Sequence, residues 1–400
     1  IKFYREDGDF FVFVRGANQL LNFDEITRAE TSHFTYPPFL ALLFIPLTFV
    51  SLNIAKIIFY IVSLFSLICS IYFLKHLIFS CVKFRNFSEK QRYLIILLGV
   101  GLSIKRIISV FENQQVDLLV TFSILACLYF YSKKRDLLGS FFLAVSIAIK
   151  CTPALFIIYY FFKLQFKKAF SIIFFTIFLL FLPDILFYNG NFSYMGDWIA
   201  KIIIQHPTIA KFAHPNWNGK SLAPGAGYEK INQSLGALIY RRFPDNLKNK
   251  SLKFLSFNIH ILDLTKYILF FFLLIFPVIL VKKNAFKYSA DHCPEKIIEA
   301  GIILTLMLLF SPMSSKAHFN TLMVGMCVLF AYYFLTQNSK ILWFAIIPVS
   351  FLTTFISRGT VTKAGTEIFY EYGAVTIGTL WLYFALCLQL KLETNKPKKT

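Results

Sequence analysis

Long apolar segments separated by short polar ones extend along nearly the whole chain, and this pattern predicts a bundle of membrane helices. A helix that crosses a bilayer needs about 20 apolar residues, or fewer where its neighbours bury its ends. Eleven segments fit this description: 54–79, 92–110, 116–131, 137–149, 152–163, 167–187, 266–281, 297–313, 319–335, 340–357 and 374–390. We therefore expect an all-α polytopic membrane protein with about 11 transmembrane helices, and we expect a further first helix to precede Ile1.

Lysine and arginine clusters predict the orientation of these helices. They follow the first, third, fifth and seventh segments, and they recur in the C-terminal tail. The clusters are Lys83, Arg85, Lys90 and Arg92; Lys133, Lys134 and Arg135; Lys163, Lys167 and Lys168; Lys282, Lys283 and Lys287; and Lys396, Lys398 and Lys399. Short cytoplasmic loops are enriched in these residues. We therefore expect a multi-pass protein of the plasma (inner) membrane that begins outside and ends in the cytoplasm.

Some apolar stretches are too short to cross the membrane alone. The stretch 37–50 opens with two prolines and is expected to enter the membrane and return on the same side. The segments 137–149 and 152–163 are expected to form a tight pair that bends at Lys150 and Pro153. Interrupted helices at membrane depth usually line a cavity. These short re-entrant helices therefore indicate a binding site.

The remaining polar segments form loops outside the cytoplasm. We treat 1–400 as a single domain, in which 1–36 is the first extracytoplasmic loop and 188–265 is the large one. The Asn, Gly, Pro and Trp content of the large loop predicts an ordered cap with a short amphipathic helix near 196–205.

Composition agrees with this class and excludes others. Hydrophobic residues make up 57% of the chain and the mean hydropathy is +0.62, so we expect no separate soluble domain. A net charge of +20 would suggest nucleic acid in a soluble protein, but many cations here lie in short loops, where topology and anionic lipids account for them. The seven cysteines form no CxxC pair and read as small core residues. We expect no nucleic-acid partner, no disulfide framework and no metal site.

Most unusual polar residues fall at the end of the bundle opposite the cation-rich loops, so one membrane face is predicted to carry the chemistry. Cations at membrane depth are costly unless they are paired or hydrated, and a lipid phosphate would satisfy them. Lys105 and Arg106 could equally extend to the membrane interface. Lys150, at the tip of a broken hairpin, has no long helix along which to do so. The full set is Asp9, Lys105, Arg106, Gln114, Gln115, Lys150, Asn232 to Ser234, Arg241, Arg242 and the run Ser311 to His318.

An ordered series of short motifs resembles glycosyltransferase family 87 of the GT-C class, whose members are polyprenyl-phosphate-mannose-dependent mannosyltransferase-like enzymes. The series is GDF, FTYPPF, NQQVD, AIKCTP, NQS and SPMSSKAHF. Three positions depart from the family pattern, with Gln114 in place of Gly, Asp117 in place of Asn and Phe13 in place of Tyr. The positions that match are Asp9, Tyr36 to Pro38, Gln115, Lys150, Pro153, Asn232 to Ser234, Ser311, Pro312 and His318.

The resemblance implies a GT-C fold and a hexosyltransferase activity. Such an enzyme passes a hexose, typically mannose, from a polyprenyl-phosphate donor to a lipid-linked or polysaccharide acceptor outside the cytoplasm, for cell envelope biogenesis. An inverting transfer needs a carboxylate that deprotonates the acceptor hydroxyl. The lipid phosphate leaves as an anion that cations can stabilise. We therefore expect a metal-independent reaction with no cofactor, and partners that include membrane lipids.

Each candidate residue has a predicted role and an alternative. We expect Asp9 to be the base, with Asp24 and Glu25 as weaker candidates, although Asp9 could be a solvated acid. His318 is expected to contact the donor phosphate or orient the acceptor, or else to bond a carbonyl at a helix start. Asn232, Gln233 and Ser234 suit either a sugar or a loop turn. The donor-phosphate set is Lys150, Lys105, Arg106 and Arg241, and the sugar or acceptor set is Gln115, Asn232, Gln233, Ser234 and Tyr36.

Two other functions compete with the transferase. A polyprenyl-lipid flippase or transporter would also have broken helices with buried cations, but no inverted repeat is visible. A non-catalytic envelope assembly subunit would be favoured if Asp9 proved dispensable. Of the remaining acids, Glu299 lies near the cytoplasmic end, where a structural ion pair is expected, and Asp184 has no predicted role. Asn191 and Asn249 lie in N-x-S/T sequons.

Overall fold

The structure is a computed structural model that describes residues 8–27, 34–188, 190, 193–204, 230–244, 250–254, 257–281 and 294–395. Both sequons, the three lysines predicted between 282 and 287, and the tail lysines lie outside these residues.

The described chain is almost entirely helical, as the apolar pattern predicts. Its long and medium helices follow that pattern segment by segment, and shorter pieces connect them. The elements are α1 (Asp9–Leu21), α2 (Pro38–Thr48), α3 (Leu52–Phe79), η1 (Val82–Phe84), α4 (Glu89–Gly101), α5 (Ile104–Asn113), α6 (Asp117–Ser132), α7 (Asp136–Ile149), η2 (Thr152–Ala154), α8 (Leu155–Phe162), α9 (Phe166–Phe187), α10 (Tyr194–Trp198), η3 (Ile199–Ile204), α12 (Leu235–Arg242), β1 (Ser251–Phe254), β2 (Phe257–His260), α14 (Ile261–Val281), α15 (Pro294–Phe310), η6 (His318–Thr321), α16 (Leu322–Thr336), α17 (Ser339–Ile341), η7 (Leu342–Ile346), α18 (Ile347–Ser350), η8 (Phe351–Phe355), α19 (Arg358–Val361), α20 (Lys363–Glu371) and α21 (Ala374–Thr394).

Several of these helices are long and apolar enough to cross a membrane, so the chain is a multi-pass membrane protein. Among the described residues, five helices meet this test, and a sixth span is possible if α4 and α5 count as one. That pair bends by 54° at its break, which interrupts the predicted segment 92–110. Four other predicted segments are shorter apolar helices, among them α6, α7 and α8, and the segment 297–313 is α15, which does not meet the test. The predicted total of 11 crossings is thus not confirmed, although a helix is present at each predicted segment.

Three features differ from the sequence prediction. The first outer loop contains the 13-residue helix α1, because its phenylalanines recur at helical spacing and bury Phe10 and Phe13. The large loop contains an antiparallel pair, β1 and β2, with Ser251 opposite His260, so the protein is not strictly all-α. Between the predicted segments 340–357 and 374–390, where the pattern predicts no helix, the chain forms α19 and α20. Short helices are present in the stretch 37–50, as α2, and near 196–205, as α10 with η3, while the re-entrant path of 37–50 stays a prediction.

Close helix packing at the centre of the bundle connects its two ends. α6 packs against α3 and α7, α7 packs against α9, and α15 packs against α21. At Gly139 on α7, an added Cβ would lie 2.6 Å from the ring of Tyr131, so only glycine allows α6 and α7 to approach this closely. α6 spans about 24 Å from Asp117 to Ser132, which separates the outer polar residues from the cation-rich turn at 133–135.

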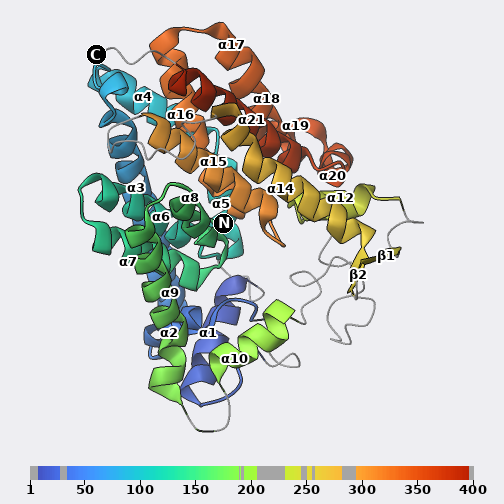
Figure 1. Cartoon of the computed structure of the whole chain (residues 1–400). Helices are drawn as coiled ribbons and strands as arrows, with labels where there is room; N and C mark the ends of the chain where they lie inside the picture. Colours follow the sequence, from blue (N-terminus) through green and yellow to red (C-terminus); the bar gives the residue numbers. More distant parts are fainter. Residues whose placement is uncertain are drawn as a thin grey trace.

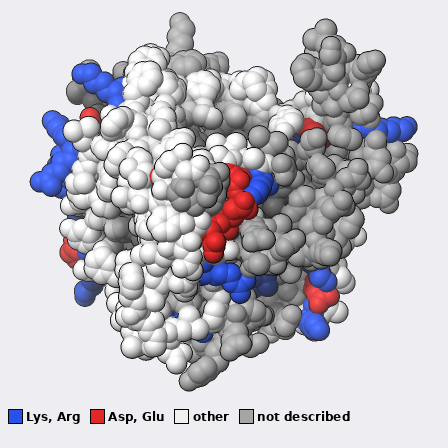
Figure 2. Space-filling model, turned by 90° about the horizontal axis from the view of Figure 1, so that it is seen from below, with Lys and Arg blue, Asp and Glu red and all other residues white. Residues whose placement is uncertain are grey.

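The predicted outer elements gather at one side of the molecule. Figure 1 shows α1, α2 and α10 together at the bottom of the view and α12 with β1 and β2 at the right, whereas the C-terminus and α4 lie at the upper left. Seen from below in Figure 2, most described atoms are uncharged, and acidic and basic side chains meet in one group near the centre.

Candidate functional site

Asp9 lies where three segments from distant parts of the sequence meet. It is the first residue of α1, and its Oδ2 atom accepts hydrogen bonds from the Tyr36 hydroxyl at 3.3 Å and from Gln115 Nε2 at 3.0 Å. Among the described residues, no donor reaches its other oxygen, Oδ1. The structure therefore brings together three predicted site residues and leaves one carboxylate oxygen of Asp9 available.

Local sequence explains why these residues meet. Buried Phe13 packs against the rings of Phe44 and Tyr36 at centroid distances of 5.0 and 5.1 Å, which fixes both α1 and Tyr36. Gln114 adopts a left-handed backbone with φ of 54°, and this turn ends α5 just before Gln115. At Gly8 an added Cβ would lie 2.5 Å from Gln114 Oε1. The glycine of the GDF motif thus allows Asp9 to approach the turn between α5 and α6.

Burial changes the acid–base properties of Asp9. Removal from water raises the pKa of Asp9 above its ordinary value, and the nearby charge of Asp117 raises it further. The hydrogen bond from Gln115 and the charge of Lys150 act in the opposite direction without cancelling the burial. A carboxylate with a raised pKa is a stronger proton acceptor, which suits a general base.

Lys150 forms a buried ion pair with Asp117. Its Nζ lies 2.9 Å from Asp117 Oδ1, and the two side chains are only 13% and 7% exposed. Lys150 follows the end of α7, where Pro153 and the short helix η2 bend the chain, as predicted. Lys150 Nζ also lies 5.9 Å from the centre of the Tyr36 ring. The predicted phosphate-binding lysine therefore adjoins the Asp9 group.

Asp117 is the main site residue that the sequence did not predict. It was seen only as a departure from the family pattern, yet it starts α6 at the centre of the group and its Oδ2 is buried without a hydrogen-bond partner among the described residues. The signal was present in the sequence. An acid that directly precedes an apolar helix and follows Gln115 by two residues is costly at that depth unless it is paired.

His318 is held in one tautomer by its own loop. The backbone N–H of Ser315 donates to His318 Nδ1 at 3.2 Å. Because a backbone N–H can only donate, Nδ1 is the acceptor and the neutral ring carries its proton on Nε2. His318 lines a small cavity with Lys150, Asp117 and Ser311. The cavity has a volume of about 20 Å³, which admits one water-sized group.

The NQS motif ties together the loops that surround the site. Asn232 donates to the carbonyl of Pro312 at 2.9 Å and accepts from the backbone N–H groups of Ser234 and Ser314, both at 3.0 Å. Gln233 Nε2 donates to the carbonyl of Tyr370 at 2.8 Å. Ser234 caps α12. These contacts match the loop-turn alternative, and the predicted sugar contact is not tested by them.

The remaining predicted cations have backbone partners. Lys105 Nζ donates to the carbonyl of Thr354 at 3.2 Å and to that of Ile356. Arg106, only 1% exposed, donates to the carbonyl of Thr353 and to the Tyr370 hydroxyl. Arg241 donates to the carbonyl of Asn232 at 2.8 Å. None of the three has a described contact with Asp9 or Lys150, so their predicted phosphate role stays a prediction.

The other acids occupy structural positions. Glu25 and Asp197 both pair with Lys201, at 2.8 and 2.7 Å, while Asp24 is exposed. Asp184 accepts hydrogen bonds from the first backbone N–H groups of α10, at 2.6 Å from Tyr194. These contacts leave Asp9 as the acid of the first outer segment that lies beside Lys150.

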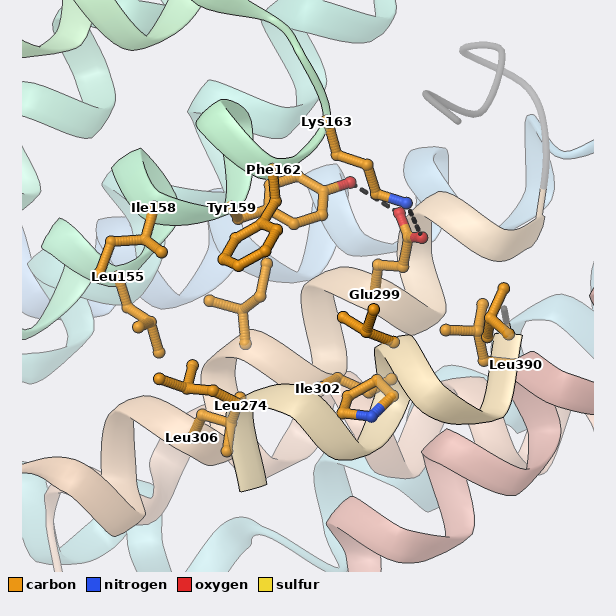
Figure 3. A pocket seen from close by; sticks show the side chains of 14 residues that line it. Leu155, Ile158, Tyr159, Phe162, Lys163, Leu274, Glu299, Ile302, Leu306 and Leu390 are labelled. Carbon is orange, nitrogen blue, oxygen red and sulfur yellow. Dashed lines mark hydrogen bonds and ion pairs between the residues drawn. The ribbon is translucent and has the colours of Figure 1, made fainter. Parts of the chain in front are cut away.

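The structure also contains an apolar groove. It has a volume of about 100 Å³ and lies between α8, α14 and α15, with lining residues that include Leu155, Ile158, Leu274 and Leu306 (Figure 3). Thr152 and Met307 line the small cavity, and Leu155 and Leu306, which are close to them in sequence, line the groove.

An ion pair closes the far end of the groove. Lys163 Nζ lies 2.5 Å from Glu299 Oε1, and the Tyr159 hydroxyl donates to Glu299 Oε2 at 2.7 Å (Figure 3). The structural ion pair expected for Glu299 is therefore confirmed. Because these charges satisfy one another, the groove has an apolar character along its length.

Comparison with known proteins gives one family match. Residues 34–223 match the profile of glycosyltransferase family 87, a region that includes Tyr36, Gln115 and Lys150 but not Asp9 or His318. No curated protein and no solved structure matches the chain. The match agrees with the helical membrane architecture and with the motif series. The chain is therefore a multi-pass membrane protein in which residues 34–223 are similar to glycosyltransferase family 87.

Proposed function

We propose that this enzyme transfers a hexosyl residue, with mannose as the expected sugar, from a polyprenyl-phosphate donor to a lipid-linked or polysaccharide acceptor at the extracytoplasmic face. The observation that carries the proposal is that a carboxylate and an ammonium group lie close together. A carboxylate with one available oxygen, Asp9, lies beside a buried lysine, Lys150, and both are connected through Tyr36. A base and an anion-binding cation are the two groups that an inverting transfer from a phosphate requires.

The reaction follows from these positions. The acceptor hydroxyl gives its proton to Asp9 Oδ1 as the acceptor oxygen attacks the anomeric carbon. The bond from that carbon to the phosphate oxygen breaks on the opposite face, so the anomeric configuration inverts. The lipid phosphate leaves as an anion, and the ammonium of Lys150 and the Nε2–H of His318 stabilise it. Because these groups stabilise the leaving phosphate, the scheme requires no metal ion.

The most direct test is transfer by the purified protein. We expect radiolabelled sugar to pass from a polyprenyl-phosphate hexose to an acceptor lipid, and a panel of such donors identifies the sugar. A protein that moves the intact donor between leaflets of vesicles without cleaving it would instead be a flippase.

The apolar groove supports a lipid-linked donor. Its lining includes Leu155, three residues after Thr152 of the cavity that Lys150 lines, and it follows α8 for about two turns, in line with a phosphate head group followed by a long apolar chain. Its lining also includes Leu274 on α14, an apolar helix in which only 11% of an 18-residue window is buried, as expected for a helix that faces lipid. An isoprenoid chain could enter the groove from the bilayer.

Filling the groove is expected to weaken binding of long-chain donors. Leu274→Trp places a larger ring in the groove, so affinity for an undecaprenyl-phosphate hexose should fall at least about fivefold, because apolar chain contacts are lost. Affinity for a short-chain analogue that reaches only the small cavity should not change. Ile279→Trp, on the same helix but 60% exposed and outside the groove, is the matched control. Equal losses for long and short donors would show that the groove holds no chain.

The membrane side of the site can be determined by labelling. Asp24 and Lys133 are both exposed and lie at opposite ends of the predicted topology. In a variant without the natural cysteines, we expect Asp24→Cys to react with an impermeant thiol reagent in intact cells and Lys133→Cys to react only after lysis. The reverse pattern would place the site in the cytoplasm.

A further inference from the structure

One carboxylate oxygen of Asp117 is buried and accepts no hydrogen bond from the described residues. Lys150 occupies Oδ1, while Oδ2 is buried and has no partner among the described residues. A buried carboxylate oxygen without a donor is costly, and such atoms in native proteins usually have a function. Asp117 lines the small cavity, so the oxygen has a space from which a donor can reach it.

The cavity limits what that donor can be. Its volume of about 20 Å³ holds a single water-sized group, such as one hydroxyl, but not a sugar ring. The hydroxyls of Ser311 and Ser314, which also line it, already donate to the carbonyls of Met313 and Leu308, each at 2.7 Å. Those hydroxyls therefore offer acceptors rather than donors to a group that enters, and the Lys150 ammonium pairs with the other oxygen of Asp117, Oδ1.

We propose that Asp117 binds a hydroxyl of the transferred sugar through Oδ2 while it holds the Lys150 ammonium through Oδ1. The inference rests on the proposed function and names a sugar-binding residue within it. One carboxylate then fixes the sugar and the phosphate-binding cation relative to each other. Asp9 keeps the role of the base, because Asp117 is already paired with the Lys150 ammonium and a paired carboxylate is the weaker proton acceptor.

A hydroxyl that bonds a buried carboxylate discriminates strongly against analogues that lack it. A hydrogen bond to a charged group contributes enough for about a 10- to 100-fold change in affinity. The loss of a donor opposite a buried acceptor also leaves that acceptor unpaired, which accounts for the strong rejection of deoxy analogues by such sites.

The test combines variants with a series of donors. Undecaprenyl phosphate, undecaprenyl-phosphate mannose and its monodeoxy analogues are bound to the full-length protein in detergent micelles. In the natural protein, removal of one particular hydroxyl should weaken binding about 10- to 100-fold. In Asp117→Asn, where an amide replaces the acceptor, removal of the same hydroxyl should change binding less than about threefold. Bare undecaprenyl phosphate should bind Asp117→Asn at least as tightly, because Lys150 no longer has a competing carboxylate.

The outcomes separate this inference from the proposed function. If the natural protein binds none of these lipids, both the proposed function and this inference are overturned. If it binds and transfers mannose but Asp117→Asn keeps the same sensitivity to hydroxyl removal, only the role of Asp117 is overturned. Asp24→Asn is the control and should behave as the natural protein. If Asp117→Asn does not fold, the uncharged pair Asp117→Asn with Lys150→Met is compared with Lys150→Met alone, with the same expectation for hydroxyl sensitivity.

Discussion

Asp9→Asn is expected to lower the transfer rate by at least about 100-fold while donor binding is unchanged. The amide keeps the shape and the contacts with Tyr36 and Gln115 but cannot accept the proton of the acceptor hydroxyl. Loss of general-base catalysis typically costs about 10²- to 10⁴-fold in rate. Single-turnover transfer with a radiolabelled donor measures the rate, and equilibrium binding of the same donor measures affinity.

Asp24→Asn is the matched control for this prediction. It removes an exposed carboxylate from the segment that follows α1 and should leave transfer unchanged. A near-normal rate in Asp9→Asn with intact donor binding would contradict the assignment, and Asp117 would then be the nearest carboxylate to consider.

The pH dependence of the transfer rate should also reflect the ionisation of Asp9. Burial raises the pKa of Asp9, and transfer needs its ionised form. The rate should therefore fall as pH is lowered through this raised pKa, so the acid limb lies at higher pH than for an ordinary aspartate. In Asp9→Asn this limb should be absent from the residual activity. Profiles of kcat/KM between about pH 4 and 8 test this expectation.

Lys150→Met should affect both donor affinity and stability. Without its ammonium, affinity for undecaprenyl phosphate should fall at least about 10-fold, since a charge-assisted contact is lost. The variant also leaves Asp117 as an unpaired buried carboxylate, which typically destabilises a fold by about 3–5 kcal/mol. A loss of affinity in this variant alone is therefore open to a second explanation.

A second substitution separates the two effects. Lys150→Met with Asp117→Asn removes both charges, so stability should recover, but the affinity for undecaprenyl phosphate should remain low. Thermal unfolding and lipid binding measure the two quantities. Recovery of affinity together with stability would return Lys150 to a purely structural role.

Periodicity and charge predicted the helices well because a membrane helix must be apolar along its length. The segments near α3, α9 and α21 were therefore visible from the sequence. The apolar pattern was less informative for helices that are short or that contain both polar and apolar residues. The break after Gly101 and the helices α19 and α20 depend on tertiary contacts, and the hairpin of β1 and β2 lies in a polar loop without a strong alternation.

The candidate site was predicted in part. Asp9, Lys150 and His318 could be selected because ionisable side chains near apolar membrane segments are costly and usually have a function. What the sequence did not reveal was how they are paired. Asp117 as the partner of Lys150 depends on the relative rotation of α6 and α7, and the backbone partners of Lys105 and Arg106 lie about 250 residues away in sequence.

The contacts of Lys105 and Arg106 also have a consequence for the order of membrane assembly. The carbonyl groups of Thr353 and Thr354 lie in the π-helix η8. They accept hydrogen bonds from Arg106 and Lys105 of α5. Unsatisfied carbonyls are costly inside a bilayer. During synthesis α5 is made long before η8, so the donors are in place when the later segment enters. The C-terminal third thus takes hydrogen-bond donors from a helix of the first third, so we expect the two parts to mature together rather than as independently inserted halves.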